Sequence, residues 1–325
     1  MKKKYQKLGL IAIASVLVSG NVMAQSPGFG GEDHHHIIEE ERGRNIARQI
    51  SDSIYINVSD QLLAEENPLY TAGLGQTPLA ASADKGSVLD SVWTNVSWTE
   101  ISNDGLAAQG DDDIYQFTAG VDKRFGNLFV GLTTSYAYTE NEVGGVGSQG
   151  DIHTVDVTPY AAFVLTKNIF LSATTGYSYT RSEPDVVGVN NDKDRDEYKT
   201  ELTINGVKSY DNLFIKARAG GRYRHTDDYF DAGNGAGLDN DQDEWTYLVD
   251  AEVGYIISKG LRFYGGALYE YVEKEDGEDD GVLYMSTGID YSVSKALTVG
   301  LKYRTDANNE DVDFHTVGLN LNLAL

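Results

Sequence analysis

The sequence predicts an all-β fold: a twelve-stranded antiparallel transmembrane outer-membrane β-barrel preceded by an amphipathic helix. Three observations lead to this prediction. Segments of roughly 10 to 15 residues alternate apolar and polar side chains, as strands do when one face meets lipid and the other a polar lumen. The connections between these segments alternate between tight turns and long acidic loops, and tyrosines gather where the apolar faces end.

The clearest of these segments is 128–138, with the sequence LFVGLTTSYAY. One alternate set of its side chains is apolar and ends in two tyrosines, whereas the other set is mostly small and polar. Segments 169–179 and 261–271 repeat this arrangement. A tilted strand crosses a bilayer in about 9–11 residues. We therefore expect each of these segments to span a membrane with its apolar face against lipid.

Residues 1–24 have the pattern of a secretory signal peptide, because lysines at 2–4 precede the apolar run 8–18 and Ala24 ends the segment. No later run approaches the roughly 20 apolar residues that a membrane helix needs. The signal and the absence of cysteine indicate an exported bacterial protein that does not depend on disulfides. The net charge of -24 argues against a nucleic-acid partner. We expect it in the outer membrane, with lipid, lipopolysaccharide and the barrel assembly machinery as partners.

Residues 25–36 have no periodic pattern, and we interpret them as a flexible tail. This tail ends in three adjacent histidines, His34, His35 and His36. Histidines can hold a transition metal, but adjacent positions in regular structure do not converge on one ion. The sequence therefore favours a solvated tail, and we expect no cofactor.

Residues 37–67 are predicted to form a helix. Apolar residues recur there at steps of four, and Pro68 follows the segment; the recurring residues are Ile46, Ile50, Ile54, Val58 and Leu62. Within this segment, 53–59 (SIYINVS) also alternates like a strand. A helix of this length would be about 45 Å long, enough to thread a barrel. It could equally lie on another surface in the periplasm. Residues 68–87, which are rich in small and polar side chains, are interpreted as a linker to the barrel.

Period-two alternation places twelve strands in 88–325. The predicted ranges are 88–101, 113–125, 128–140, 152–165, 169–181, 196–210, 213–225, 245–257, 261–273, 282–292, 296–305 and 314–325. Short connections of two or three residues alternate with longer loops that are acidic and mostly rich in glycine. Short turns on one rim and long loops on the other are typical of outer-membrane barrels, and they put the short turns in the periplasm.

Aromatic residues support the same topology. Tyrosines on the expected lipid-facing side fall at the long-loop ends of their strands: Tyr136, Tyr138, Tyr177, Tyr179, Tyr223, Tyr269, Tyr271 and Tyr303. A second group lies near the tight turns and consists of Phe125, Tyr210, Tyr255 and Tyr291. Two aromatic girdles are what the two membrane interfaces favour, since one end of a tyrosine is apolar and the other is wet.

Charged residues concentrate on the opposite, lumen-facing side. The candidate lumen-lining residues, expected to contact a pore solute or a plug, are Lys216, Arg218, Arg222, Arg224, Glu201, Asp250, Glu252, Arg262, Glu270, Lys302 and Arg304. A two-residue turn at 211–212 would place Glu201 opposite Arg222 and Asn205 opposite Arg218. Acids and bases together favour ion-pair networks that make the wall rigid. The alternative is that the basic strand 213–225 binds an anionic solute or a plug helix.

The sequence offers little support for catalysis, and we expect no enzyme and no catalytic residues. A barrel phospholipase type uses a histidine with a serine two residues later, a pair that is absent here. Barrel proteases use aspartate and histidine at the outer rim, where His225, Asp227 and Asp228 are expected, but no opposing acidic pair is evident. Asp239, Asp241 and Asp243 have calcium-loop spacing, yet Glu244 replaces the turn glycine, so we expect a solvated acidic loop and no metal.

Several motifs together resemble the translocator domain of autotransporters. They are Gly120-Val121-Asp122, the turn at Gly126-Asn127, Gly131 to Tyr136 with Tyr138, Thr158-Pro159-Tyr160 and Gly176-Tyr177. The resemblance covers about 88–325 and implies twelve strands, a helix in the lumen before the first strand, and an upstream passenger carried to the cell surface. The segment 37–67 matches the position of that helix. The stretch 25–36 is too short for a normal passenger, and Leu325 stands where such barrels usually end in Phe or Trp.

This resemblance implies an autotransporter-like barrel with 37–67 in its pore as helix and plug. Two other functions remain open from the residues. One is a passive diffusion channel for small anionic solutes, resembling twelve-stranded porins for acidic sugars, with the bases of 213–225 as the attracting strip. The other is a structural or adhesive surface barrel that acts through its acidic loops.

Overall fold

The computed structural model describes residues 33–67, 70, 89–103, 110–143, 148–185, 193–230, 241–258, 260–274, 280–294, 297–307 and 313–325. The predicted signal peptide lies outside these residues, as do most of the predicted tail and linker. The helix is α2 (Asp33–Glu66). The strands are β1 (Ser91–Asn103), β2 (Gly110–Phe125), β3 (Leu128–Val143), β4 (Ser148–Thr166), β5 (Ile169–Asp185), β6 (Lys193–Tyr210), β7 (Leu213–Phe230), β8 (Gln242–Ser258), β9 (Leu261–Lys274), β10 (Asp280–Ser292), β11 (Leu297–Asp306) and β12 (Asp313–Ala324).

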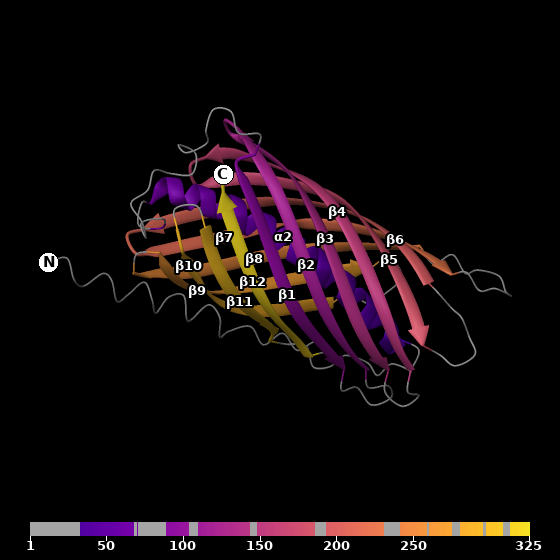
Figure 1. Cartoon of the computed structure of the whole chain (residues 1–325). Coiled ribbons are helices and arrows are strands. Elements are labelled where there is room, and N and C mark those ends of the chain that lie inside the picture. The colour runs from indigo at the N-terminus through magenta and orange to yellow at the C-terminus, as the bar shows by residue number, and fades with distance from the viewer. Residues whose placement is uncertain are drawn as a thin grey trace.

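The strands form a closed barrel (Figure 1). Each strand pairs with its neighbours in the chain, and β1 closes the sheet by pairing antiparallel with β12. Closure leaves no strand edge unpaired, which a membrane requires because lipid cannot satisfy backbone hydrogen-bonding groups. The predicted twelve-stranded antiparallel barrel is confirmed.

The predicted register of the β6–β7 hairpin is also confirmed. Tyr210 pairs with Leu213 across the turn, and Glu201 lies opposite Arg222 further along the ladder. The turn residue Asp211 has a φ of 52°. Aspartate tolerates this left-handed conformation better than most residues do, so a two-residue turn can join the strands here.

Most strands extend further toward the long-loop rim than the alternation predicts. β4 begins at Ser148 instead of residue 152, and β7 ends at Phe230 instead of residue 225. The added residues are largely polar on both faces, so they carry no apolar alternation, yet the ladder continues through them and pairs Asp196 with Asp227. The long loops are therefore shorter than predicted. Backbone pairing continues beyond the part of the strand that contacts lipid, and there neither face has to be apolar.

The two faces of the strands differ in exposure as the girdle prediction requires. On β3, Leu132 and Tyr136 point outward and are 47% and 45% exposed, whereas Phe129 and Thr133 point inward and are fully buried. Aromatic side chains at both rims share the outward exposure: Tyr177, Tyr179, Tyr269, Tyr271 and Tyr303 at the long-loop rim, and Phe125, Tyr210, Tyr255 and Tyr291 at the tight-turn rim. The apolar outer surface therefore lies between two aromatic bands.

Two inward-facing glycines make room for aromatic rings on the neighbouring strand. A Cβ atom added at Gly131 would lie 2.2 Å from Cζ of Tyr160, and one added at Gly254 would lie 2.0 Å from Cζ of Phe214. These distances are below van der Waals contact, so only glycine lets the rings lie against the wall there.

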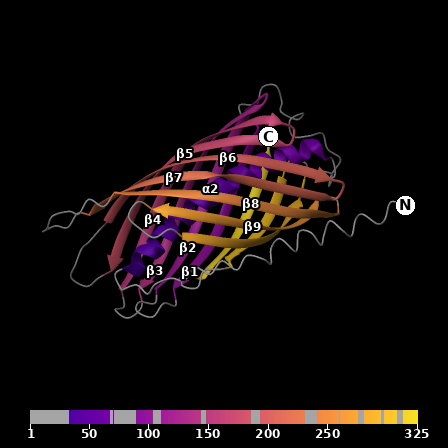
Figure 2. The same cartoon turned by 180° about the vertical axis from the view of Figure 1, so that it is seen from behind.

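The helix α2 runs through the inside of the barrel, and two opposite views agree on this position (Figures 1 and 2). It begins at Asp33, so residues 33–36, which the sequence analysis assigned to the flexible tail, are helical. The segment 53–59 is helical as well, and its strand interpretation is wrong. In the middle of a closed barrel a helix satisfies its own backbone hydrogen bonds, whereas a strand would have no edge to pair with. Among the described residues, no helix is long and apolar enough to cross a membrane.

Candidate functional site

The candidate site is the lumen of the barrel together with the helix inside it. Of the α2 side chains that the structure describes, only Glu65 is exposed. The helix is polar over much of its length, so its burial requires partners for its charged groups. These partners come from the inward face of the wall, and they differ between the two ends of the helix.

Toward the long-loop rim, arginines of α2 contact acids of the wall, while Glu40 and Glu41 of the helix pair with Arg44 of the same helix. Nη1 of Arg42 lies 3.2 Å from a carboxylate oxygen of Asp112 on β2. Nη1 of Arg44 lies 3.2 Å from a carboxylate oxygen of Glu244 on β8. These contacts place the amino-terminal part of the helix beside the long-loop ends of the strands.

Arg48, near the middle of the helix, is the most enclosed of these bases. It donates hydrogen bonds to Glu270 on β9, from Nε at 2.9 Å and from Nη2 at 2.7 Å. The guanidinium also lies 4.0 Å from the ring centroid of Tyr284, whose hydroxyl accepts a third hydrogen bond from it. Arg48 is 0% exposed, so the wall and α2 together enclose its side chain completely.

Further toward the tight-turn rim the charges are reversed, because the helix is acidic and the wall is basic. Asp52 pairs with Arg218 on β7 and Arg304 on β11, and Lys302 lies 3.8 Å from it. About two helical turns further on, Asp60 pairs with two wall bases in the same way. It lies 2.8 Å from Nζ of Lys216 and 3.4 Å from Nη2 of Arg262.

The structure places all the candidate lumen-lining residues on the inner face of the barrel. Those with hydrogen bonds or ion pairs to α2 are Lys216, Arg218, Arg262, Lys302, Arg304, Glu201 and Glu270. The other four pair with neighbouring strands. Arg222 lies 2.7 Å from Glu201, and Arg224 lies 2.7 Å from Glu244. Asp250 on β8 lies 3.2 Å from Arg218, and Glu252 on the same strand lies 3.4 Å from Lys216. The strand 213–225 therefore does not present a free basic strip to the lumen.

A further polar cluster surrounds Asp122 on the inner face of β2. Asn57 of α2 donates a hydrogen bond of 2.6 Å to Asp122 on β2, and Tyr160 donates one of 3.1 Å to the same oxygen. Asn322 on β12 donates to the side-chain oxygen of Asn57 at 2.8 Å. Asn57 is thus held by β2 and β12 at once, near the seam where the barrel closes.

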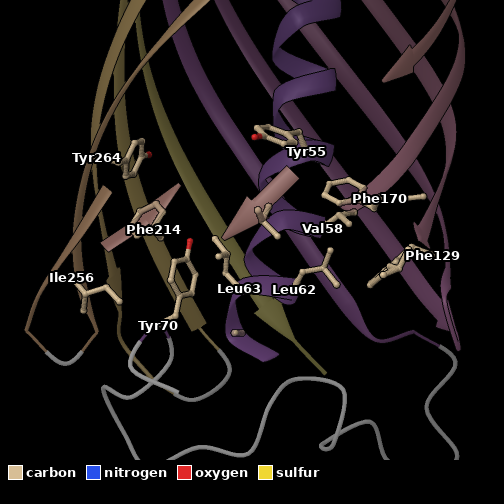
Figure 3. Packing of buried hydrophobic residues seen from close by; sticks show 14 residues of the cluster. Tyr55, Val58, Leu62, Leu63, Tyr70, Phe129, Phe170, Phe214, Ile256 and Tyr264 are labelled. Atoms are coloured by element: carbon tan, nitrogen blue, oxygen red, sulfur yellow. The ribbon is translucent and has the colours of Figure 1, made fainter. Parts of the chain in front are cut away.

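The carboxyl-terminal part of α2 is packed in an apolar belt at the tight-turn end (Figure 3). Val58, Leu62 and Leu63 of the helix are at most 2% exposed. The wall contributes a phenylalanine at the second residue of each of three strands: Phe129 on β3, Phe170 on β5 and Phe214 on β7. Tyr70, which follows the helix, packs edge-on against Phe214 with ring centroids 5.2 Å apart.

The end of the helix is attached to the turns of the tight-turn rim by its last polar residues. Glu66 accepts hydrogen bonds from Nδ2 of Asn168 and the backbone N–H of Ser209, both at 3.0 Å, and it pairs with Lys208. Asn67 donates to the backbone carbonyl of Asp211 at 2.7 Å. Glu65 pairs with Arg124 on β2. We refer to these contacts of Glu65, Glu66 and Asn67 as the rim clamp.

Sequence reasoning did not name the helix residues Arg48, Asp52 and Asp60 as the partners of the wall charges. Nothing in a single sequence relates a helix position to strands more than a hundred residues away. A signal was available for the apolar belt. Phe129, Phe170 and Phe214 directly follow Leu128, Ile169 and Leu213, so bulky side chains stand on both faces at the start of these strands. Apolar residues on the inner face indicate that something apolar fills the lumen at that level.

The structure describes only some of the residues that the sequence suggested for metal binding or proteolysis. Asp239 and the side chains of Asp228, His34, His35 and His36 lie outside the described residues. Asp241 directly precedes β8, and Asp243 lies on β8 opposite His225.

Comparison with known proteins agrees with this architecture. A family model described as the autotransporter beta-domain matches residues 92–304. No match was found among curated proteins.

Three solved structures have a similar fold. The translocator domain of autotransporter NalP from Neisseria meningitidis is 11% identical, with a TM-score of 0.60 over 76% of this chain and 92% of that chain. The beta domain of the Bordetella autotransporter BrkA is 14% identical, with a TM-score of 0.62 over 73% and 100% of the two chains. The transport unit of the autotransporter AIDA-I from Escherichia coli is 12% identical, with a TM-score of 0.54 over 80% and 99%. At these identities the likeness concerns the fold alone.

Proposed function

The chain belongs to the autotransporter beta-domain family, and from this premise we propose that it is an outer-membrane barrel whose lumen is plugged by its own helix α2. The family assignment supports an outer-membrane location. The signal-peptide pattern of residues 1–24 supplies the route of export in this proposal.

The observation that carries the proposal is the reversal of charge along the helix. Arg42, Arg44 and Arg48 meet wall acids, whereas Asp52 and Asp60 meet wall bases. A helix inserted the other way round, or shifted by about two turns, would bring like charges together in a low-dielectric interior. The pattern therefore favours one direction and one depth of the helix, which supports a resident plug over a segment in transit.

The same pairs count against a passive channel for small anions. Such a channel needs unpaired bases along the pore, and here Lys216, Arg218 and Arg304 each pair with a carboxylate of α2. An anion entering the lumen would have to compete with these carboxylates. The surface-coat alternative depends on loops that are largely outside the described residues, and no described contact favours it. The proposal assigns no catalytic step to the lumen, since its charged groups serve to hold the helix.

The direction of the helix determines the side of the membrane on which the preceding segment lies. Arg42 contacts Asp112 near the long-loop end of β2, whereas Glu66 contacts the tight-turn rim. Long loops face the cell exterior in barrels of this kind. We therefore place the residues that precede α2 at the cell surface, which is the side to which the passenger of an autotransporter is carried.

Two experiments test this proposal. The first compares single-channel conductance in planar bilayers for the full mature chain and for a chain lacking residues 26–67. The proposal expects a several-fold higher conductance after the deletion, and a chain lacking only 26–32 serves as the matched control that keeps α2. Equal conductance in all three would contradict a plug.

The second experiment determines the side of the membrane. An epitope inserted after Pro27 should be labelled by antibody on intact cells as strongly as on permeabilised cells. Labelling that requires permeabilisation would place the segment in the periplasm and reject the direction proposed for the helix.

A further inference from the structure

The outer ends of β7 and β8 hold a histidine surrounded by carboxylates, outside the lumen. Nε2 of His225 lies 2.7 Å from Asp227, and Nδ1 of His225 lies 2.7 Å from Asp243. Asp241 completes the group, because one ligand atom each from His225, Asp227 and Asp241 lie within 4.8 Å of one another. All four side chains are beyond the girdle residue Tyr223 and are at least partly accessible to solvent.

The charges of this group do not balance. A neutral imidazole has one N–H, so it can donate to only one of the two carboxylates that face its nitrogens. Even a doubly protonated ring leaves three carboxylates against one positive charge. In the described part of the chain, no lysine or arginine lies within salt-bridge distance of Asp227, Asp241 or Asp243.

A neighbouring strand adds to the imbalance. Asp196 on β6 stands directly opposite Asp227 in the ladder. Like charges at directly opposite positions destabilise a sheet. A divalent cation between the carboxylates would remove this repulsion, which water and monovalent salt only screen.

We propose that Nε2 of His225 and the carboxylates of Asp227 and Asp241 bind a zinc ion, and that Asp243 is a positioning residue for His225. The site goes beyond the plug function, since none of its residues faces α2. The ion joins the end of β7 to the start of β8.

The distances suit this ion. Zinc binds histidine nitrogen and carboxylate oxygen at about 2.0–2.2 Å, so two ligands of one tetrahedral ion lie about 3.3 Å apart. The three ligand atoms lie at most 4.8 Å from one another. Small rotations of the aspartate side chains, which are at the surface, would bring them to the distances that zinc requires. Water fills the fourth position. Imidazole together with oxygen ligands suits zinc better than calcium, which prefers oxygen ligands alone.

The contact between Nδ1 of His225 and Asp243 orients the imidazole ring. Metal-binding histidines commonly donate their other ring N–H to a carboxylate, which fixes the tautomer and aims the free nitrogen at the metal. Asp243 is in that position at Nδ1, and it is itself held by a hydrogen bond of 2.6 Å from the hydroxyl of Tyr223. The pair Tyr223–Asp243 thus holds Nε2 toward Asp227.

The test measures zinc bound by the purified full chain in detergent, after EDTA treatment and equilibrium dialysis against zinc at high ionic strength. His34, His35 and His36 are replaced by alanine in every sample, because an exposed run of histidines binds zinc by itself. We expect one zinc ion per chain in this background. His225→Gln and Asp227→Asn should each weaken binding at least tenfold, and Asp243→Asn should weaken it about 10- to 100-fold without changing the stoichiometry.

His153→Gln is the matched control. His153 also lies on the outer face near the girdle, but its Nδ1 contacts the hydroxyl of Tyr136 at 2.8 Å and no carboxylate contacts its ring among the described residues. This variant should bind zinc as the background does. Folding of each variant is verified by its heat-modifiable mobility in electrophoresis. Absence of stoichiometric zinc in the background, or binding that survives His225→Gln, would overturn the proposal, as would an equal loss in His153→Gln.

Discussion

Arg48 of α2 and Glu270 of β9 form an ion pair that is shielded from solvent on every side. Nη2 of Arg48 lies 2.7 Å from the carboxylate, and the two side chains are 0% and 1% exposed. Charges removed from water in this way are costly unless they remain paired, so each of the two residues depends on the other. The helix α2 and the barrel wall therefore share one polar core and are not two independent parts.

A double-mutant cycle on this pair should reveal strong coupling. Within the described part of the chain, Arg48→Met leaves Glu270 with only Arg222, at 3.9 Å, as an ion-pair partner. Glu270→Leu leaves Arg48 without its main acceptor. Each single change should lower the free energy of unfolding by about 3–5 kcal/mol, whereas the double variant should lose much less than the sum. Denaturant unfolding of the detergent-solubilised chain measures this. Additive losses would mean that the pair contributes no coupling.

Reversing the charge at Asp52 should open the pore. Asp52→Lys places a cation among Arg218, Arg304 and Lys302, and two like charges 4 Å apart repel by about 4 kcal/mol at an effective dielectric constant of 20. We expect at least a tenfold rise in the frequency of open events in planar bilayers. Asp52→Asn, which keeps the shape and removes the charge, should have a smaller effect.

Glu100→Lys is the control for net charge, since it changes the charge of the chain by the same amount on the outward face of β1. It should leave the opening frequency unchanged. A response to Asp52→Lys no larger than the response to Glu100→Lys would remove the electrostatic basis of the plug.

The barrel could be predicted from the sequence because its rules are local. Alternation assigns a face to each residue, and a short turn such as 211–212 fixes the register of two strands, so the pairing of Glu201 with Arg222 could be stated in advance. The outer ends of the strands could not be placed, because polar residues on both faces give no alternation.

The contacts of the helix could not be predicted, since they combine residues from distant parts of the chain. Asp52 meets Arg218 and Arg304, which are 166 and 252 residues away. Which wall residues face a given helix position depends on the rotation and depth of α2, and no local pattern encodes either quantity. The isoleucine spacing indicated a helix, but not which strands it touches.

Gly131 should tolerate no side chain. A Cβ atom there would lie 2.2 Å from Cζ of Tyr160, so the ring must leave the wall and its hydrogen bond to Asp122 must break. Gly131→Ala should destabilise the barrel by about 1–3 kcal/mol in denaturant unfolding. Gly265→Ala is the matched control, because its Cβ would meet only the carbonyl oxygen of Ser286 at 3.5 Å. Equal effects of the two substitutions would show that the close approach has no energetic importance.

Acidification on the periplasmic side should weaken the rim clamp. Glu66 lies at the rim, outside the membrane-spanning part of the barrel. Burial alone would raise the pKa of Glu66, but hydrogen bonds from Lys208, Asn168 and the N–H of Ser209 outweigh it and hold the pKa below its ordinary value of 4.5. A carboxyl whose pKa is lowered in the folded state stabilises that state above its ordinary pKa and loses this contribution as the pH falls through the lowered value. The clamp should therefore be intact at neutral pH and weaken only below about pH 4.5.

The measurement is the frequency of brief current openings as the periplasmic solution is taken from pH 7 to pH 3. The wild-type chain should open more often over the acidic part of this range. Glu66→Gln cannot carry the negative charge at any pH, so it should already open more often at pH 7 and respond less to acid. Because the remaining carboxylates titrate equally in both chains, the difference between the two curves isolates Glu66. Coinciding curves would show that Glu66 does not hold the end of the helix, and the attachment would then rest on Glu65 and Asn67.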